Sequence, residues 1–195
     1  MDMIGTVVRL QVQTSSLKVE ASPRRQRYDP TPIVSIPMVA LDEGGMIAPR
    51  GPEQSVVDVH HRIHPDSKYR DGNAVSILFT PHYAAMRDHF GSHLEDGIAG
   101  ESILVETGSM VALGDLERGV TLLTAEGEWI DLTRAQVAEP CVEFTRFALR
   151  FPADAPSDRS VTNALTFLRG GMRGFYLDYR GDPVTLRLGD PVYLP

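Results

Sequence analysis

Residues 97–106 read Gly97-Ile98-Ala99-Gly100-Glu101-Ser102-Ile103-Leu104-Val105-Glu106, so that two glycines precede a short apolar run. Glycine supplies the positive φ angles that tight turns need, and a run of branched apolar residues between such breaks is typical of a β-strand. The stretch therefore predicts a turn that leads into a strand over Ser102 to Glu106. The same arrangement recurs along the chain and decides the fold class.

Further segments combine Val, Ile and Thr enrichment with Gly, Pro or Asp at their ends. They are Gly5 to Val12, Ile33 to Leu41, Ser55 to His61, Ala74 to Phe79, Thr121 to Thr124, Trp129 to Gln136, Val142 to Phe144, Gly174 to Asp178 and Pro183 to Leu188. Strands that are this short and closely spaced are typical of a barrel or a sandwich. We predict a mainly β fold with a few short helices.

Two segments have helical rather than strand character. The first runs from Thr80 to Phe90, with a capping Thr, a Pro at the first helical position and apolar residues at helical spacing. The second runs from Ser160 to Gly170, with Ser160 as the predicted cap and one apolar face. Each is predicted to be a short helix, the second packed on the β-structure.

Length, composition and charge limit the class of protein. A chain of 195 residues with 42% hydrophobic and 23% charged residues predicts a single domain, 1–195, with no membrane-spanning segment. The first residues resemble a strand rather than a signal peptide, which predicts a cytoplasmic protein. The net charge of −7 argues against nucleic-acid binding, because that requires clustered Lys and Arg.

Arginines nevertheless gather in two parts of the chain, and the ligand class stays open. One group lies at positions 24, 25 and 27, and the other comprises Arg146, Arg150, Arg169 and Arg173. Such clusters can bind a small anion despite the negative total charge. For the first group we prefer a solvated loop to a binding patch.

Cys141 is the single cysteine of the chain and the first candidate for chemistry. It follows Pro140 and precedes charged and aromatic residues, and it cannot form an intramolecular disulfide. Free cysteine is commonly a small buried hydrophobe, whereas a reactive thiolate needs an exposed, electropositive environment. Both interpretations of Cys141, packing and reactive, remain open from composition alone.

Three of the six histidines, His60, His61 and His64, lie close to Asp58. If residues 55–61 form a strand, His60 and His61 point to opposite faces, and at most one joins His64 and Asp58 around a metal. This geometry disfavours a divalent metal site. We prefer His60 at the mouth of a pocket that Cys141 faces, with an inert surface loop as the alternative.

Several motifs, taken in order, resemble the MOSC domain, the module named after the C-terminal part of molybdenum-cofactor sulfurase. Gly97 to Glu106 is similar to the family's Gly-Glu-Asn-Leu segment, and Leu113-Gly114-Asp115 to its Leu-Gly-Asp element. Glu139-Pro140-Cys141 resembles the family's cysteine after a proline. Arg169 to Tyr176 and Gly189-Asp190-Pro191-Val192 resemble its Gly-rich turn and final Gly-Asp-Pro-Val. The resemblance runs from about Gly5 to Val192.

The resemblance implies a MOSC-like β-barrel and a role around the molybdenum cofactor (molybdopterin). Cys141 would either bind molybdenum as a thiolate ligand or carry sulfur, and soft thiolates suit such a metal. By motif matching, Gly100, Glu101 and Ser102 would line the cofactor pocket, with Arg146 and His60 contacting anionic groups. Pyridoxal phosphate binding is an association of the family and attaches to no residue of this chain.

The resemblance also implies an activity and partners. Reduction of N-hydroxylated compounds is the reaction it favours, with electrons from a separate reductase because no flavin or Fe–S motif is visible. The alternative is a non-enzymatic sulfur-relay or ligand-binding module that receives sulfur from a cysteine desulfurase. Ser102 stands where the family has Asn, which removes an amide contact, and the oligomeric state is left open.

Overall fold

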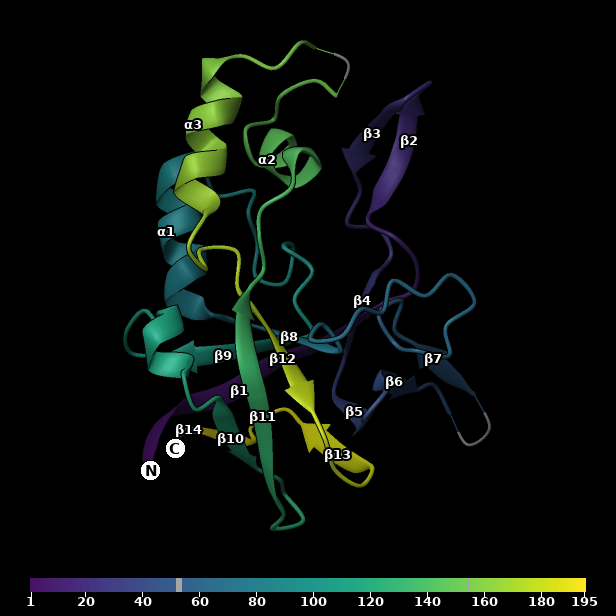
Figure 1. Ribbon diagram of the computed structural model, residues 1–195, viewed down its shortest axis with the longest axis vertical. Helices are drawn as coiled ribbons and strands as arrows, with labels where there is room; N and C mark the ends of the chain where they lie inside the picture. The colour runs from purple at the N-terminus through teal and green to yellow at the C-terminus, as the bar shows by residue number, and fades with distance from the viewer. Residues whose placement is uncertain (52–53, 154) are drawn as a thin grey trace.

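The computed structural model describes residues 1–51, 54–153 and 155–195, and within them the fold is mainly β (Figure 1). The first strands are β1 (Asp2–Gln13), β2 (Lys18–Ser22), β3 (Arg25–Tyr28), β4 (Ile33–Ile36), β5 (Met38–Asp42), β6 (Gly45–Pro49) and β7 (Ser55–Val57). The later strands are β8 (Val75–Phe79), β9 (Ile103–Thr107), β10 (Val120–Leu123), β11 (Trp129–Val137), β12 (Phe175–Tyr179), β13 (Val184–Arg187) and β14 (Pro191–Leu194). The helices are α1 (Thr80–Phe90), α2 (Val142–Ala148) and α3 (Arg159–Leu168), with a 3₁₀ turn at Leu113–Leu116.

The main sheet closes on itself as a barrel. Its strands follow the order β14-β10-β11-β12-β8-β9-β1-β4, and β14 also pairs with β1, so that seven strands form a closed ring. All pairings are antiparallel except that of β8 with β9, which α1 connects. A parallel pair needs a crossover, and here the helix supplies it.

Strand β1 is long enough to join three neighbours. Its first half pairs with β14, its second half with β4, and β9 runs along its other edge. Gly5 allows the approach, because a Cβ there would overlap the carbonyl oxygen of Glu106 on β9. The barrel interior holds the larger buried apolar cluster, which includes Leu10, Phe79 and Phe175.

The remaining elements surround one end of the barrel. A second sheet has the order β13-β5-β6-β7, and β2 with β3 forms a separate hairpin. Figure 1 shows this hairpin on the far side of α2 from the neighbouring helices α1 and α3. A second apolar cluster, which includes Tyr28, Tyr83 and Phe144, fills the space under the helices. Among the described residues no helix is long and apolar enough to cross a membrane.

Three sequence predictions of strands need correction. The predicted strand Ile33 to Leu41 is broken at Pro37 into β4 and β5, since proline cannot donate to a ladder. The predicted strand Ser55 to His61 ends at Val57, and His60 and His61 lie in a turn. Because these histidines are not in a strand, the expectation that His60 and His61 point to opposite faces does not apply.

The prediction of a strand at Val142 to Phe144 was wrong, because α2 occupies Val142–Ala148. The branched Val142 and the aromatic Phe144 suggested a strand. The helix is favoured instead because the side chain of Cys141 caps its first turn and because Phe144 packs into the apolar cluster under the helices. The other two helices are confirmed, although Phe79 rather than Thr80 occupies the N-cap position of α1 and makes no side-chain capping bond. Asp158, rather than Ser160, caps α3, its carboxylate accepting from the backbone N–H groups of Ser160 and Val161.

Candidate functional site

A cleft of about 620 Å³ opens beside the end of the barrel, between the β2–β3 hairpin and the start of α2. It is lined by His60, by the adjacent residues Gly100 and Glu101, and by Cys141, which come from three separate parts of the sequence. Lys68, Arg70, Arg173, Tyr28, Tyr176 and Gln136 also contribute to its wall. Most of the candidate residues of the sequence therefore meet in one place.

Cys141 lies at the junction of β11 and α2, where its thiol reaches the cleft. Its Sγ accepts a 3.5 Å hydrogen bond from the backbone N–H of Phe144, and its carbonyl accepts a 2.8 Å bond from Thr145 Oγ1. The residue is half-buried, packed on one side against the cluster under the helices. The thiol is thus positioned by the first turn of the helix, and Cys141 is one of the residues that line the cleft.

Glu101 is a buried carboxyl group with one unsatisfied oxygen. Its side chain is 4% exposed, Oε2 accepts a 2.8 Å hydrogen bond from the Tyr83 hydroxyl, and Oε1 has no partner. Burial raises the pKa of Glu101 to about 7, against the lowering effects of Tyr83 and of Arg9 and Arg173. The group therefore exchanges a proton near neutral pH.

Arg173 places a cation in the same cleft. Its Nη2 donates a 2.9 Å hydrogen bond to the carbonyl of Ala99, the guanidinium lies 4.9 Å from the ring centroid of Phe144, and Nε is buried without a partner. Burial lowers the pKa of Arg173, but the Coulombic effects of Tyr28, Cys141 and Tyr176 and a hydrogen bond with Tyr28 together raise it. Arg173 stays charged next to the thiol.

Sequence reasoning did not assign Arg173 to the site, although it did note Arg173 among clustered arginines. The feature of the sequence that could have indicated Arg173 as a site residue is the Gly-rich turn in which it lies. Gly174 has a φ of 105°, and a Cβ there would lie 2.7 Å from the carbonyl oxygen of Ile77 on β8. The turn therefore fits tightly over β8 and fixes the arginine at the cleft.

Gly100 lies in the wall of the cleft in a backbone conformation that favours glycine. Its φ is 84°, and a Cβ there would come within 2.6 Å of Leu17 Cδ1 and 3.1 Å of Gln13 Nε2. The carbonyl of Gly100 accepts a 2.6 Å hydrogen bond from Gln13 Nε2. Tyr28 lies beside it, its hydroxyl donating to Ile98 O at 2.7 Å, and burial raises the pKa of Tyr28 so that it remains a donor.

His60 lies at another part of the cleft wall, paired with Asp58. Its Nδ1 is 3.1 Å from Asp58 Oδ1, and Asp58 Oδ2 accepts a 2.6 Å bond from the backbone N–H of Gln13. Because a carboxylate accepts, Nδ1 carries the proton of this bond. Among the described residues no group of three or more His, Cys, Asp or Glu side chains is arranged to hold a metal ion.

Two predicted site residues do not line the cleft. The Ser102 hydroxyl is buried 3.1 Å from the hydroxyl of Ser76, where it joins β8 to the start of β9. Arg146 lies on the other side of α2, donating to Pro152 O at 2.7 Å, Ala153 O at 3.1 Å and Ser157 Oγ at 3.0 Å. Each side chain makes local structural contacts, and Arg173, rather than Arg146, lines the cleft together with Cys141.

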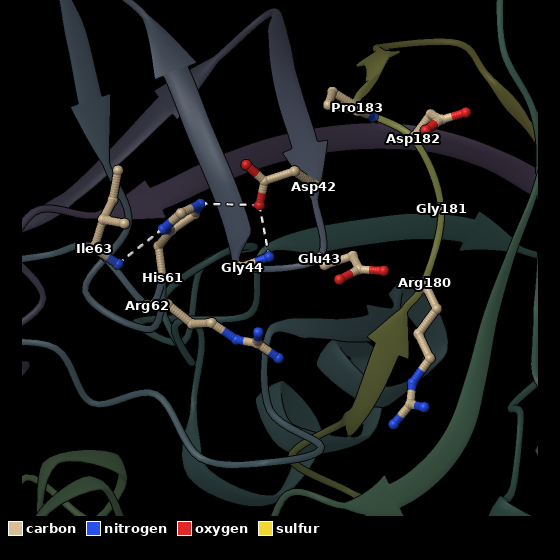
Figure 2. A pocket seen from close by; sticks show the side chains of 10 residues that line it. All are labelled: Asp42, Glu43, Gly44, His61, Arg62, Ile63, Arg180, Gly181, Asp182 and Pro183. Atoms are coloured by element: carbon tan, nitrogen blue, oxygen red, sulfur yellow. Dashed lines mark hydrogen bonds and ion pairs between the residues drawn. The ribbon is translucent and has the colours of Figure 1, made fainter.

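A separate shallow hollow lies around His61, next to the β5–β6 turn (Figure 2). His61 Nδ1 accepts from the backbone N–H of Ile63 at 3.2 Å, so Nε2 carries the proton and donates to Asp42 Oδ1 at 3.0 Å. Figure 2 shows Arg62 and Arg180 extending past this pair without an interaction drawn to it. The histidine is therefore used to hold the turn.

The similarity of this chain to known proteins concerns its fold. No protein-family model and no curated protein sequence matches the chain. The YuaD protein from Bacillus subtilis superposes with a TM-score of 0.56 at 13% identity, over 98% of this chain and 94% of that one. YiiM from Geobacillus stearothermophilus has a TM-score of 0.50 at 12% identity, over 100% of this chain and 74% of that one.

YiiM from Escherichia coli also matches, with a TM-score of 0.50 at 14% identity over 83% of this chain and 64% of that one. At these identities the likeness concerns the fold. The predicted mainly β barrel with a few short helices is confirmed by the closed seven-strand sheet and by the similar folds of these neighbours.

Proposed function

We propose that the cleft binds a molybdenum cofactor, with the Cys141 thiolate as a ligand of the metal, and that the loaded protein reduces N-hydroxylated compounds. The supporting observation is the meeting of three groups in one cleft. These are an accessible thiol, a buried carboxyl oxygen of Glu101 without a partner and a buried Nε of Arg173 without a partner. Unpaired buried polar atoms are rare and point to a missing ligand.

The residues present fit such a group. A thiolate is a soft donor suited to molybdenum, and the cations of Arg173, Lys68 and Arg70 suit the anionic groups of a pterin cofactor. A volume of about 620 Å³ lies within the range of small-molecule sites. When bound, the cofactor would supply a two-electron redox centre.

The protein's own groups would handle protons. Reduction of a hydroxylamine to an amine and water consumes two electrons and two protons, with the electrons delivered by a separate reductase. Glu101, whose pKa is raised to about 7 by burial, holds a proton at neutral pH inside the cleft. His60, oriented by Asp58, is the second group able to give a proton at the cleft wall.

The test is the molybdenum and pterin content of protein purified from a host that makes the cofactor. Wild type should carry both in near-equal amounts, and Cys141→Ser should lose the metal. Arg169→Gln, a substitution at an exposed arginine outside the cleft, should retain wild-type content. Equal and negligible content in all three proteins would refute cofactor binding.

The half-buried thiol beside Arg173 also supports a second candidate, a sulfur relay. In it, the Cys141 thiolate attacks the persulfide of a cysteine desulfurase, takes the terminal sulfur and releases the desulfurase thiolate. Mass spectrometry after incubation with a desulfurase and cysteine should then show an adduct of about 32 Da, one sulfur atom, on Cys141. An adduct without bound molybdenum favours the relay, and the reverse favours the cofactor.

A further inference from the structure

A second cavity of about 410 Å³ lies between β3 and α2, on the opposite side of Tyr28 from much of the cleft. Tyr28 belongs to the walls of both spaces, so they are neighbours but have different linings. Neither Cys141 nor Glu101 lines the second cavity. Three aromatic and three arginine side chains in its lining give the cavity an aromatic side and a positively charged side.

The aromatic side of the cavity consists of Tyr28, Phe147 and Phe151. The rings of Tyr28 and Phe147 are 5.2 Å apart at an interplanar angle of 51°. The Arg146 guanidinium lies 5.3 Å from the centroid of Phe151 and thereby fixes that ring beside the cavity. The three rings offer π-faces and edges to a planar apolar ligand.

The charged side consists of Arg27, Arg146 and Arg150. Arg146 is 8% exposed and uses three of its five N–H groups on carbonyls and a hydroxyl, without an ion pair in the described part of the chain. Arg150 is exposed, and its side chain has no hydrogen bond or ion pair with any described residue. Guanidinium groups next to aromatic rings favour an anion with an apolar body.

The acidic groups nearby are already engaged. Glu143, the one carboxylate among the described lining residues, pairs with Lys18 at 3.0 Å, and Arg27 pairs with Asp29 at 3.0 Å. One arginine of the first group noted in the sequence, Arg27, thus meets two of the second, Arg146 and Arg150, at this cavity, in a chain with a net charge of −7. A local excess of positive charge in an acidic protein needs a specific explanation.

We propose that this cavity is a binding site for a small aromatic carboxylate of one or two rings. The ring system packs against Phe147, Phe151 and Tyr28, and the carboxylate accepts hydrogen bonds from Arg150 and from the remaining N–H groups of Arg146. The site is separate from the cofactor cleft and does not depend on whether the cleft binds molybdenum.

The probe is 2-naphthoate, measured by calorimetric titration of the purified protein, with 2-naphthamide as its neutral analogue. Saturable 1:1 binding of 2-naphthoate is expected, with the amide bound about tenfold more weakly, since the loss of one charge-assisted contact changes affinity by about that factor. Arg150→Gln should weaken 2-naphthoate about tenfold. Arg70→Gln, a substitution at an exposed arginine of the cleft wall, is the matched control and should bind as wild type.

Three outcomes overturn the proposal. One is the absence of saturable binding to wild type. Another is equal affinity for the carboxylate and the amide. The last is weaker binding in Arg70→Gln together with unchanged binding in Arg150→Gln, which places the ligand in the cleft. Because Arg150 is exposed, Arg150→Gln is expected to fold normally, and its thermal unfolding is recorded beside the titration.

Discussion

The hydroxyl of Tyr83 donates a 2.8 Å hydrogen bond to Glu101 Oε2, and both side chains are buried beneath the cleft. Burial raises the pKa of Tyr83 well above its ordinary value, so the phenol remains a donor. It also accepts a 2.9 Å bond from the backbone N–H of Ala99, which fixes its position. Tyr83 therefore holds one carboxyl oxygen in place, while the other, Oε1, is buried without a hydrogen-bond partner.

The burial of Glu101 should make stability depend on pH. The unfolded carboxyl ionises near its ordinary pKa of 4.5, whereas the folded one keeps its proton until about pH 7. The folded state thus binds more protons than the unfolded state between these values. The contribution of this difference to the free energy of unfolding is fully present below pH 4.5 and is lost as pH rises through 7. As pH rises from 4.5 to above 7, the unfolding free energy of wild type should fall by up to about 3 kcal/mol relative to that of Glu101→Gln.

Urea unfolding at pH 4.5, 6 and 8 measures this difference between wild type and Glu101→Gln. Glu106→Gln is the control, because Glu106 is exposed, and it should follow the wild-type pH profile. Parallel profiles for wild type and Glu101→Gln would contradict a raised pKa of Glu101.

Cys141 should react in the native protein. The half-buried thiol lines the cleft, so iodoacetamide should modify one site per chain without denaturant. Mass spectrometry should locate the adduct at Cys141, and Cys141→Ser should remain unmodified. A thiol that reacts only after unfolding would show that Cys141 is a packing residue and would remove the basis of both proposed functions.

Gly100→Ala should destabilise the protein and distort the cleft. The new Cβ would lie 2.6 Å from Leu17 Cδ1 at a backbone φ of 84°. The combined strain and overlap should lower the unfolding free energy by about 2–4 kcal/mol. Gly127→Ala is the matched control, since Gly127 has a φ of 88° and nothing within 4 Å of the added Cβ.

Thermal and urea unfolding of both variants separate two contributions to the loss of unfolding free energy, the overlap of the new Cβ with its neighbours and the strain of the left-handed backbone. Gly127→Ala should lose only about 1 kcal/mol, the cost of the left-handed conformation alone. Equal losses in the two variants would mean that the space around Gly100 is open.

Arg146→Gln should lower stability without changing the cleft. The substitution removes three hydrogen bonds, to Pro152, Ala153 and Ser157, and should cost about 2 kcal/mol of unfolding free energy. Iodoacetamide should still modify Cys141 at the wild-type rate. Arg150→Gln should change stability by less than about 0.5 kcal/mol, because Arg150 is exposed. Slower alkylation in Arg146→Gln alone would connect Arg146 to the cleft.

Much of the β-structure could be predicted because strand signals are local. The segments at β1, β8, β9, β11 and β12 carry branched residues between glycines, prolines and aspartates, and they form strands as expected. The failures have identifiable causes. Pro37 interrupts a ladder, and Val142 to Phe144 is too short for its periodicity to distinguish strand from helix.

The sequence alone determined a mainly β fold, the two longer helices and the candidate residues at Cys141, Gly100, Glu101 and His60, because turn glycines, strand composition and motif order are local properties. Only the tertiary structure decided which of these side chains share a cleft. Barrel closure brings segments more than eighty residues apart together, and the tight turn before β12 places Arg173 in the wall of the cleft, which Arg146 does not line. Burial also depends on all surrounding elements, so the raised pKa of Glu101 could not be read from its neighbours in the chain.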